Sequence, residues 1–434
     1  MSGASGLVKI PELRKRILFT LFMLAVYRLG VHIPTPGVDA VALEQLFANM
    51  QGTLFGVFNL FTGGAFERFS ILALGVMPYI SSSIIFQLLT VVSPYLAQLQ
   101  KEGEQGRKKI TQYTRYGTVL ICLVQAFGTA TWLEQQANPP VVLMPGLGFK
   151  VLTCITLAAG TIFLMWLGEQ ISEKGIGNGI SLVIFAGIAS GIPSGISQTL
   201  TLYRSGEMTF FTLFLVLAVV LITFFVIIFI ERGQRRIPIQ YAKRVVGRKV
   251  YGGQNTHLPL KVNVSGVIPP IFASSLIMFP ATMAQFFPYE IVQNFAVMLQ
   301  PGAVAYNVIF VGLIVFFCFF YTAVTFKTDD VADNLKKNGG FVPGIRPGQP
   351  TAEYIDYVLT RVTVGGAAYI SVVCVLPTFL TQTLNVPFYF GGTSVLILVG
   401  VALDTVSQIE TFLLQRNYEG FMKNTRIKGR KVFS

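Results

Sequence analysis

The fold of this chain is decided by stretches such as residues 208–230, MTFFTLFLVLAVVLITFFVIIFI, in which 23 residues pass without a charged side chain. A helix that crosses the roughly 30 Å hydrocarbon core of a bilayer needs about 20 residues of this kind. Seven more uncharged stretches are long enough for a helix, and they cover residues 69–100, 116–133, 151–168, 175–203, 262–289, 291–326 and 362–403. The sequence therefore predicts a chain that passes through a membrane many times.

The composition agrees with this interpretation. Apolar residues make up 53% of the 434 residues and charged residues only 12%, whereas about a quarter of the residues in a soluble domain are charged. The mean hydropathy is +0.62. A water-soluble globule, a disordered chain and a fibrous protein are all excluded. The four cysteines lie far apart within apolar stretches, which excludes a disulfide framework and a zinc site.

Two features raise the number of predicted spans to ten. The stretch 362–403 is twice the necessary length and contains Asn385, Pro387 and a Gly-Gly pair, so it predicts two helices joined by a tight turn. Residues 17–34 follow a basic N-terminal segment, carry only Arg28 and lack a cleavage site, so they predict an anchor helix. Residues 45–66 are uncharged but rich in Asn and Gly, and they predict a loop with a short helix. We expect an all-α polytopic membrane protein with ten transmembrane helices.

The basic residues predict how these spans are oriented. With ten spans, both ends of the chain lie on one side of the membrane, and only Arg28, Arg68, Lys150 and Arg204 fall on the other side. The remaining 29 of the 33 Lys and Arg residues share the side of the termini. Because cytoplasmic segments are the ones enriched in Lys and Arg, we expect cytoplasmic termini and cytoplasmic loops at 231–261 and 327–361. The net charge of +13 is then mostly a matter of topology.

Ten spans divide into halves of five, residues 1–204 and 205–434, which enter the membrane from opposite faces. This is the arrangement of an inverted repeat. The second span of each half is the one most interrupted by Gly and Pro, which points to a functional pathway there. The interrupting residues are Gly75, Pro78 and Pro94 in the first half and Gly266, Pro269, Pro270 and Pro280 in the second.

The spans offer almost no side chains for chemistry. Arg28 lies near one end of the first span, Asp404 and Glu410 lie toward the end of the last, and His32 and His257 fall near membrane boundaries. An ion-coupled carrier of small solutes usually places an acid or a histidine at the midplane, and an enzyme needs a nucleophile or an acid–base pair. The sequence therefore favours a passive pore over either class, with no cofactor or metal. The glycines of 175–179 are typical of a tight turn, because no Lys-Ser/Thr pair follows them.

One cytoplasmic loop suggests a contact with a partner. Most of its basic residues are explained by topology and by attraction to anionic lipid. Arg346, however, lies within FVPGIRPG at 341–348, where Gly and Pro fix an exposed tip. A rigidly presented arginine is typical of a docking contact.

Several long strings in this chain resemble the SecY family, the channel subunits of the bacterial protein-translocation machinery, over essentially the whole length. These strings are GVMPYIS (75–81), KEGEQGR (101–107), QYTRYG (112–117), WLGEQISEKGIGNGIS (166–181), ERGQRR (231–236), HLPLKVN (257–263), GVIP (266–269), FVPGIRPG (341–348) and GGTS (391–394). The resemblance implies a passive channel that passes unfolded secretory proteins across the cytoplasmic membrane and releases transmembrane segments sideways into it.

The resemblance also implies specific parts of such a channel. A pore ring that excludes water and ions falls on Val76, Ile80, Ile180, Ile184, Ile271 and Ile397. A plug that closes the outer vestibule corresponds to residues 59–70, with Asn59, Phe61, Gly63, Gly64, Phe66, Glu67 and Arg68 as its characteristic positions. The Glu67-Arg68 pair makes this plug more charged than we expect for the family.

The remaining implied sites concern the lateral opening and the partners. The lateral gate between the second and seventh spans falls on Ser81, Gln87, Asn263 and Phe279, and partner docking falls on Arg236, Arg248, Lys249 and Arg346. The implied partners are the membrane subunits SecE and SecG, the SecA motor, the ribosome, and unfolded preproteins with their signal peptides. The implied location is the bacterial cytoplasmic membrane.

Overall fold

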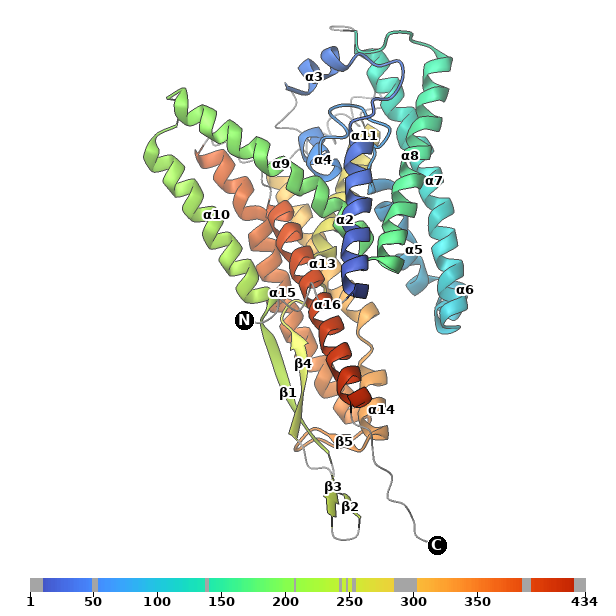
Figure 1. Cartoon of the computed structure of the whole chain (residues 1–434), viewed down its shortest axis with the longest axis vertical. Helices are drawn as coiled ribbons and strands as arrows, with labels where there is room; N and C mark the ends of the chain where they lie inside the picture. The colour runs from blue at the N-terminus through green and yellow to red at the C-terminus, as the bar shows by residue number, and fades with distance from the viewer. Residues whose placement is uncertain are drawn as a thin grey trace.

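The computed structural model describes residues 11–48, 54–136, 140–206, 208–241, 244–246, 249–251, 255–284, 303–384 and 392–424. Within these residues, ten long helices correspond to the ten predicted spans, and they pack into one bundle (Figure 1). They are α2 (Pro11–Val31), α5 (Met77–Val92), α7 (Glu104–Gln135), α8 (Leu147–Lys174), α9 (Gly179–Arg204), α10 (Phe210–Glu231), α11 (Ile268–Ala284), α13 (Val304–Thr325), α15 (Gln349–Leu384) and α16 (Gly392–Asn424).

Seven helical segments of the described chain are individually long and apolar enough to cross a membrane, and α5 with α6 (Pro94–Lys101) makes an eighth if the bent pair is one span. The helix α11 is apolar but shorter over its described residues. In α2 the charged residues are Glu12, Arg14, Lys15 and Arg16 in the first turns and Arg28 in the last, where long side chains reach the membrane surface. The turn predicted around Asn385 lies outside the described residues.

The second span differs from the single uncharged stretch that predicts it. Its helix begins only at Met77, and the chain bends by 97° between α5 and α6, at Pro94. Proline fixes its own φ and disfavours the helical conformation of the residue before it, and Ser93 is extended (φ −92°, ψ 118°). The uncharged stretch therefore overstated the length of the straight helix.

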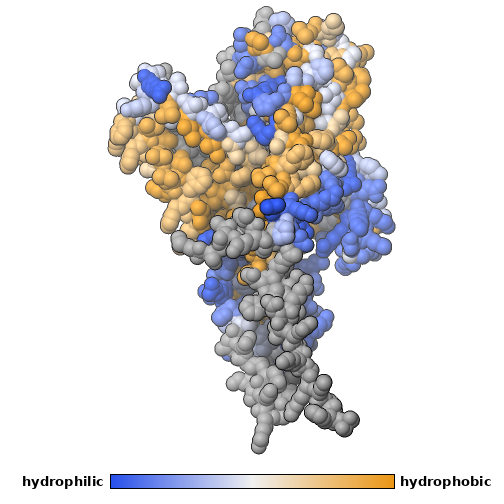
Figure 2. Space-filling model, viewed as in Figure 1, coloured by the Kyte–Doolittle hydropathy of each residue, from blue (hydrophilic) through white to orange (hydrophobic). Residues whose placement is uncertain are grey.

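The surface of the bundle is apolar around its middle. Figure 2 shows hydrophobic side chains over the bundle and hydrophilic ones toward its lower end, where α6 and the start of α7 lie. The helix α10 is the most apolar of the spans, and only 6% of its apolar 18-residue stretch is buried within the chain. Its exposed side chains include Phe211, Phe225 and Phe229. We take this face to contact lipid, because no aqueous surface would favour such a stripe.

The polar loops at the lower end contain a small sheet, which the sequence analysis did not predict. The strand β1 (Gln234–Tyr241) pairs antiparallel with β4 (Asn255–Lys261) and, on its other edge, with β5 (Gly340–Phe341). A separate hairpin joins β2 (Arg244–Val246) to β3 (Lys249–Tyr251). In β1 the buried Ile237 and Ile239 alternate with exposed residues, which is the period of a strand with one covered face.

A second apolar cluster holds this end together. Ile237 of β1, Leu260 of β4, Val342 and Ile355 are buried against one another, and Val331 and Leu335 of α14 (Thr328–Lys337) pack on them. The β1–β4 pair, the 341–348 loop and the start of α15 therefore form one unit, which we name the polar-end unit.

The interrupted spans begin in the same way. Gly75-Val-Met-Pro precedes and opens α5, and Gly266-Val-Ile-Pro precedes and opens α11. Each glycine is left-handed, with φ of +57° and +63°, a conformation that glycine adopts without a steric cost. In both cases the helix starts two residues after the glycine. The sequence analysis identified the two strings but did not recognise that the same Gly-Val-X-Pro turn precedes both helices.

Candidate functional site

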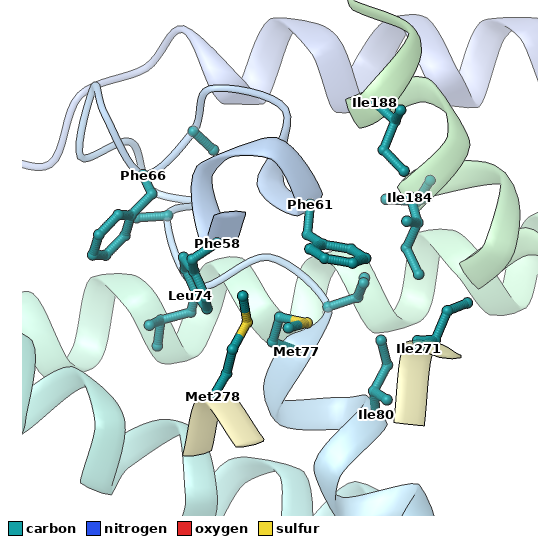
Figure 3. Packing of buried hydrophobic residues seen from close by; sticks show 14 of the residues in the cluster. Phe58, Phe61, Phe66, Leu74, Met77, Ile80, Ile184, Ile188, Ile271 and Met278 are labelled. Carbon is teal, nitrogen blue, oxygen red and sulfur yellow. The ribbon is translucent and has the colours of Figure 1, made fainter. Parts of the chain in front are cut away.

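Aliphatic side chains from four helices are buried together in the apolar core of the bundle. Val76 precedes α5, Ile80 lies on α5, Ile184 on α9, Ile271 on α11 and Ile397 on α16, and all five are at most 5% exposed. Ile180 at the start of α9 is half-buried and packs against the same cluster. Figure 3 shows Ile80, Ile184 and Ile271 pointing toward one another. The structure therefore brings the predicted pore-ring residues into one cluster, while their role in a pore stays a prediction.

A short helix covers one side of this cluster. The helix α4 (Leu54–Thr62) follows α3 (Ala40–Ala48) and ends just before the predicted plug residues Gly63 and Gly64. Both glycines are left-handed, and the amides of Gly63 and Gly64 donate to the carbonyls of Leu60 and Asn59. This is the usual way for glycines to end a helix.

The apolar face of α4 lies on the predicted pore-ring residues. Phe61 is 4% exposed and lies between Met77 and Ile184 in Figure 3. The Phe58 and Phe66 rings meet edge to face with centroids 4.8 Å apart, a favourable arrangement for aromatic pairs. The predicted plug therefore lies directly against the residues predicted to form the ring.

Polar contacts fix the other face of the plug. The Asn59 amide donates to Glu67 at 2.9 Å, and the Glu67 backbone amide donates to the Asn59 side-chain oxygen at 3.0 Å. Glu67, which looked out of place in the sequence, is thus an internal brace of the plug. From α2, the buried Tyr27 hydroxyl donates to the Thr62 carbonyl at 3.0 Å, and Arg28 donates to the Gly63 carbonyl at 2.9 Å. Sequence reasoning missed both α2 contacts.

A cavity of about 540 Å³ lies beside these contacts, and its lining includes Arg28, His32, Glu44, Asn59, Glu67 and Arg68. The Arg68 guanidinium contacts the Nδ1 atom of His32, just beyond the end of α2. Loss of hydration and the neighbouring Arg68 and Arg28 charges lower the pKa of His32. His32 therefore favours its neutral form while the plug is in this position.

The predicted gate residues lie along α5 and near α11. Across these two helices, the Ser275 hydroxyl contacts the Met77 sulfur at 3.7 Å. Ser81 and Phe279 are both half-buried. Gln87 donates to Ser83 within its own helix. Their role as a gate stays a prediction.

Asn263 lies before the start of α11 and not within it. Its amide donates to Glu231, at the end of α10, at 2.6 Å and to the Gly266 carbonyl at 3.0 Å. In the part of the chain that the structure describes, Gln87 and Asn263 share no hydrogen bond. Asn263 thus ties the end of α10 to the left-handed turn that opens α11.

The predicted docking residues lie at the polar end. Arg236 is exposed on β1, and Arg346 is exposed in the loop that packs on the same unit through Val342. The Thr351 hydroxyl donates to the Arg346 carbonyl at 2.8 Å. Lys249 lies on β3, and Arg248 lies outside the described residues.

No group of three metal-ligating side chains occurs within the described ranges. The arrangement consists instead of an aliphatic cluster shared by four helices, a plug braced on one side of it, and an arginine-bearing unit at the far end of the molecule. Such an arrangement can seal a passage and open it by movement of side chains and the plug.

Comparisons with known proteins agree with this geometry. The sequence pattern of the SecY family matches residues 70–406. The protein translocase subunit SecY of Escherichia coli strain K12 is 51% identical over 425 residues, which cover 97% of this chain and 96% of that protein. The subunit of Vibrio cholerae is 51% identical and covers 99% and 97%, and that of Aquifex aeolicus is 45% identical and covers 96% and 98%.

Solved structures share the fold at low sequence identity. A structure of a protein-conducting channel superposes with a TM-score of 0.67 at 18% identity and covers 95% of each chain. Sec61 in a canine ribosome–channel complex superposes with a TM-score of 0.63 at 17% identity, again over 95% of each chain.

Proposed function

Because this chain belongs to the SecY family of protein translocase subunits, we propose that it forms the central pore of a protein-conducting channel in the bacterial cytoplasmic membrane. It is a multi-pass membrane protein and a channel subunit, not an enzyme. Its substrates are unfolded preproteins, which enter with their signal peptides, and transmembrane segments.

The observation that carries this proposal is the aliphatic cluster of Ile80, Ile184, Ile271 and Ile397, drawn from four helices and covered by α4. A narrow ring of branched apolar side chains excludes water and thereby ions, because hydration of such a constriction is unfavourable. The same ring holds no fixed polar partner, so it can yield to a passing chain of any sequence. In the resting state the plug segment, residues 59–70, adds a second barrier.

The lateral exit lies between α5 and α11 in this proposal. Met77 and Ser275 make a weak contact across this line, and weak contacts suit a seam that must part. Ser81, Gln87 and Phe279 lie on the same two helices and Asn263 lies just before α11, and they act in gating.

The polar-end unit faces the cytoplasm, as do both termini. Its exposed Arg236 and Arg346, with Lys249 of the neighbouring hairpin and Arg248, the preceding residue in the sequence, dock the ribosome and the SecA motor. The canine Sec61 relative was solved in a ribosome–channel complex, which supports the first of these partners. SecE and SecG bind within the bilayer. The halves 1–204 and 205–434 act as two arms, and the repeated Gly-Val-X-Pro entry into α5 and α11 supports their common origin.

Vesicles that contain the purified chain with SecE, SecG and SecA test the proposal. We expect ATP-dependent import of a presecretory protein, and no import when the chain is omitted. Ile397→Asn adds a polar group to a fully buried site of the pore ring, so it raises the ion leak, whereas Ile397→Leu keeps the volume and the leak. An unchanged leak for Ile397→Asn places the seal elsewhere, and failure of import by the unaltered chain rejects the channel.

A further inference from the structure

We propose that Tyr27 and Arg28 of α2, here named the plug latch, hold the end of α4 against the pore ring and thereby set which substrates open the channel. The inference rests on the proposed channel function. It assigns a selective role to two neighbouring residues of the first span.

The latch contacts the plug where a helix end needs partners. The last carbonyls of a helix have no intrahelical donors. At the end of α4, turn amides satisfy the carbonyls of Asn59 and Leu60. Two further carbonyls at this end accept hydrogen bonds from α2. The Thr62 carbonyl accepts the Tyr27 hydroxyl, and the Gly63 carbonyl accepts the Arg28 guanidinium.

The energetics favour a latch over an incidental contact. Tyr27 and Thr62 are each 2% exposed, and the Thr62 carbonyl also accepts a long bond from the Ala65 amide, at 3.4 Å. Without the Tyr27 hydroxyl, this buried carbonyl therefore keeps one weak donor and little access to water. The Arg28 cation also complements the negative end of the helix dipole. Each bond therefore favours the docked plug, by about two- to tenfold in the ratio of closed to open channels.

On the side opposite the latch, the plug end packs closely on α9. A Cβ atom on Gly63 would lie 2.6 Å from the Gly187 Cα atom of α9. A Cβ atom on Gly187 would lie 3.1 Å from the Phe61 carbonyl and 3.2 Å from the Tyr27 hydroxyl. The plug end thus lies between a glycine of α9 and the two side chains of α2, and a movement of the plug away from α2 breaks both latch bonds.

Because of this geometry, the latch sets a minimum binding energy that a substrate must supply to open the channel. A substrate opens the channel only to the extent that it binds the open state better than the closed one. A strongly apolar signal peptide supplies that difference, and a weakened one does not. Loss of the latch lowers the binding energy that opening of the channel requires. Import of the weakened substrate therefore rises, whereas import of the strong substrate, which already opens the channel, changes little.

The test uses vesicles of the complete translocase and two substrates that differ only in the length of the apolar signal-peptide core. Tyr27→Phe removes one hydroxyl, Arg28→Gln removes the charge, and Arg28→Lys keeps the charge without the planar fork. We expect import of the weakened substrate to rise several-fold in the combined Tyr27→Phe and Arg28→Gln variant, less in Arg28→Lys, and not in the matched control Arg204→Gln at the far end of α9. Import of the strong substrate stays at the level of the unaltered chain.

A second measurement reports the plug itself. Leu60 is half-buried on α4 and lines the 540 Å³ cavity. We expect a Leu60→Cys chain to react several-fold faster with a water-soluble thiol reagent when the latch is removed. Unchanged selectivity together with unchanged labelling overturns the latch. Loss of import of the strong substrate by the unaltered chain would instead reject the channel function, and the labelling would still decide about the latch.

Discussion

At the scale of single residues, we expect His32 to make the proposed plug sensitive to acid. His32 contacts Arg68, and the charge of Arg28 also acts on it. The acidic Glu44 and Glu67 line the same cavity. The pKa of His32 is lowered in this position, so the docked plug prefers neutral His32. Its contribution is complete above the ordinary histidine pKa of about 6.5 and declines as the pH falls through the lowered value.

We therefore expect acidification on the plug side to raise the resting ion leak of the channel in planar bilayers. His32→Gln keeps a polar side chain but does not titrate, so its leak should stay flat over the same pH range. The effect is modest because His32 is exposed and solvent screens its neighbours' charges. An equal pH response in both proteins would assign the effect to another group.

The sequence predicted the residues of the centre better than those that hold the plug. The aliphatic positions from Val76 to Ile397 follow from the resemblance to the family, and the structure places them in one cluster. Tyr27 and Arg28 carried no such signal, because an aromatic and a basic residue near the end of a span are typical of membrane boundaries. Their contacts with Thr62 and Gly63 join positions 35 residues apart, which no local pattern reveals.

At the scale of elements, the left-handed glycines before α5 and α11 differ in their surroundings. A Cβ atom on Gly266 meets nothing within 4 Å, whereas one on Gly75 would lie 2.9 Å from the Thr62 methyl group of α4. Gly266→Ala should therefore cost only the backbone strain, about 1–2 kcal/mol. Gly75→Ala should cost more and also displace the plug.

Thermal unfolding of both variants in detergent checks the stability, and planar-bilayer recording checks the seal. We expect a lower unfolding temperature for both variants and a raised ion leak only for Gly75→Ala. A raised leak in Gly266→Ala would show that the turn before α11 matters to the seal in its own right.

The seam between α5 and α11 gives a second prediction at this scale. Met77 and Ser275 already touch, so a disulfide between Met77→Cys and Ser275→Cys should form on oxidation and keep the two helices together. Import should stop, and reduction should restore it. The two single variants, treated with the same oxidant, control for the native cysteines. Unimpaired import with the bond verified would place the moving seam elsewhere.

The elements show where sequence patterns reach their limit. Uncharged stretches predicted the spans because the hydrocarbon core excludes charge from any helix. They did not predict the 97° bend at Pro94 or the sheet at β1, since neither depends on charge. The Ser93-Pro94 pair indicates the bend, and the alternation of Ile237 and Ile239 indicates the strand. Both patterns cover only a few residues, so they are weaker than an uncharged stretch of about 20 residues.

At the scale of the whole molecule, the two functional ends are built differently. The plug end is held by a few polar bonds and by close contact between glycines. Few bonds must break for it to move. The polar-end unit has its own apolar core of Ile237, Leu260, Val342 and Ile355, so we expect it to keep its shape when the bundle opens. A rigid unit joined to α15 and, through β1, to α10 can transmit the force of a bound partner to the spans.

Arg346 tests whether the polar-end unit acts as a rigid docking site. Its loop is fixed by left-handed Gly344 and Gly348 and by the Thr351 hydroxyl on the Arg346 carbonyl. Its side chain is exposed, and the planar guanidinium grips a carboxylate in two places, which Lys cannot do. Arg346→Glu should weaken coupling to the motor by about 2 kcal/mol or more, with Arg346→Lys in between. Lys337→Glu, at the end of α14 in the same region, makes the same charge change without a rigid tip and is the matched control.

Motor ATPase activity stimulated by a presecretory substrate measures the coupling, in vesicles with equal amounts of channel. Because the core of the polar-end unit does not include Arg346, insertion and complex assembly should be unaffected in every variant. Labelling of an Arg346→Cys chain by an impermeant reagent in intact cells would put the unit on the outer face and reject both docking and topology. If Arg346→Glu and Lys337→Glu lower the ATPase equally, net charge alone attracts the motor, and the geometry of the loop has no part in it.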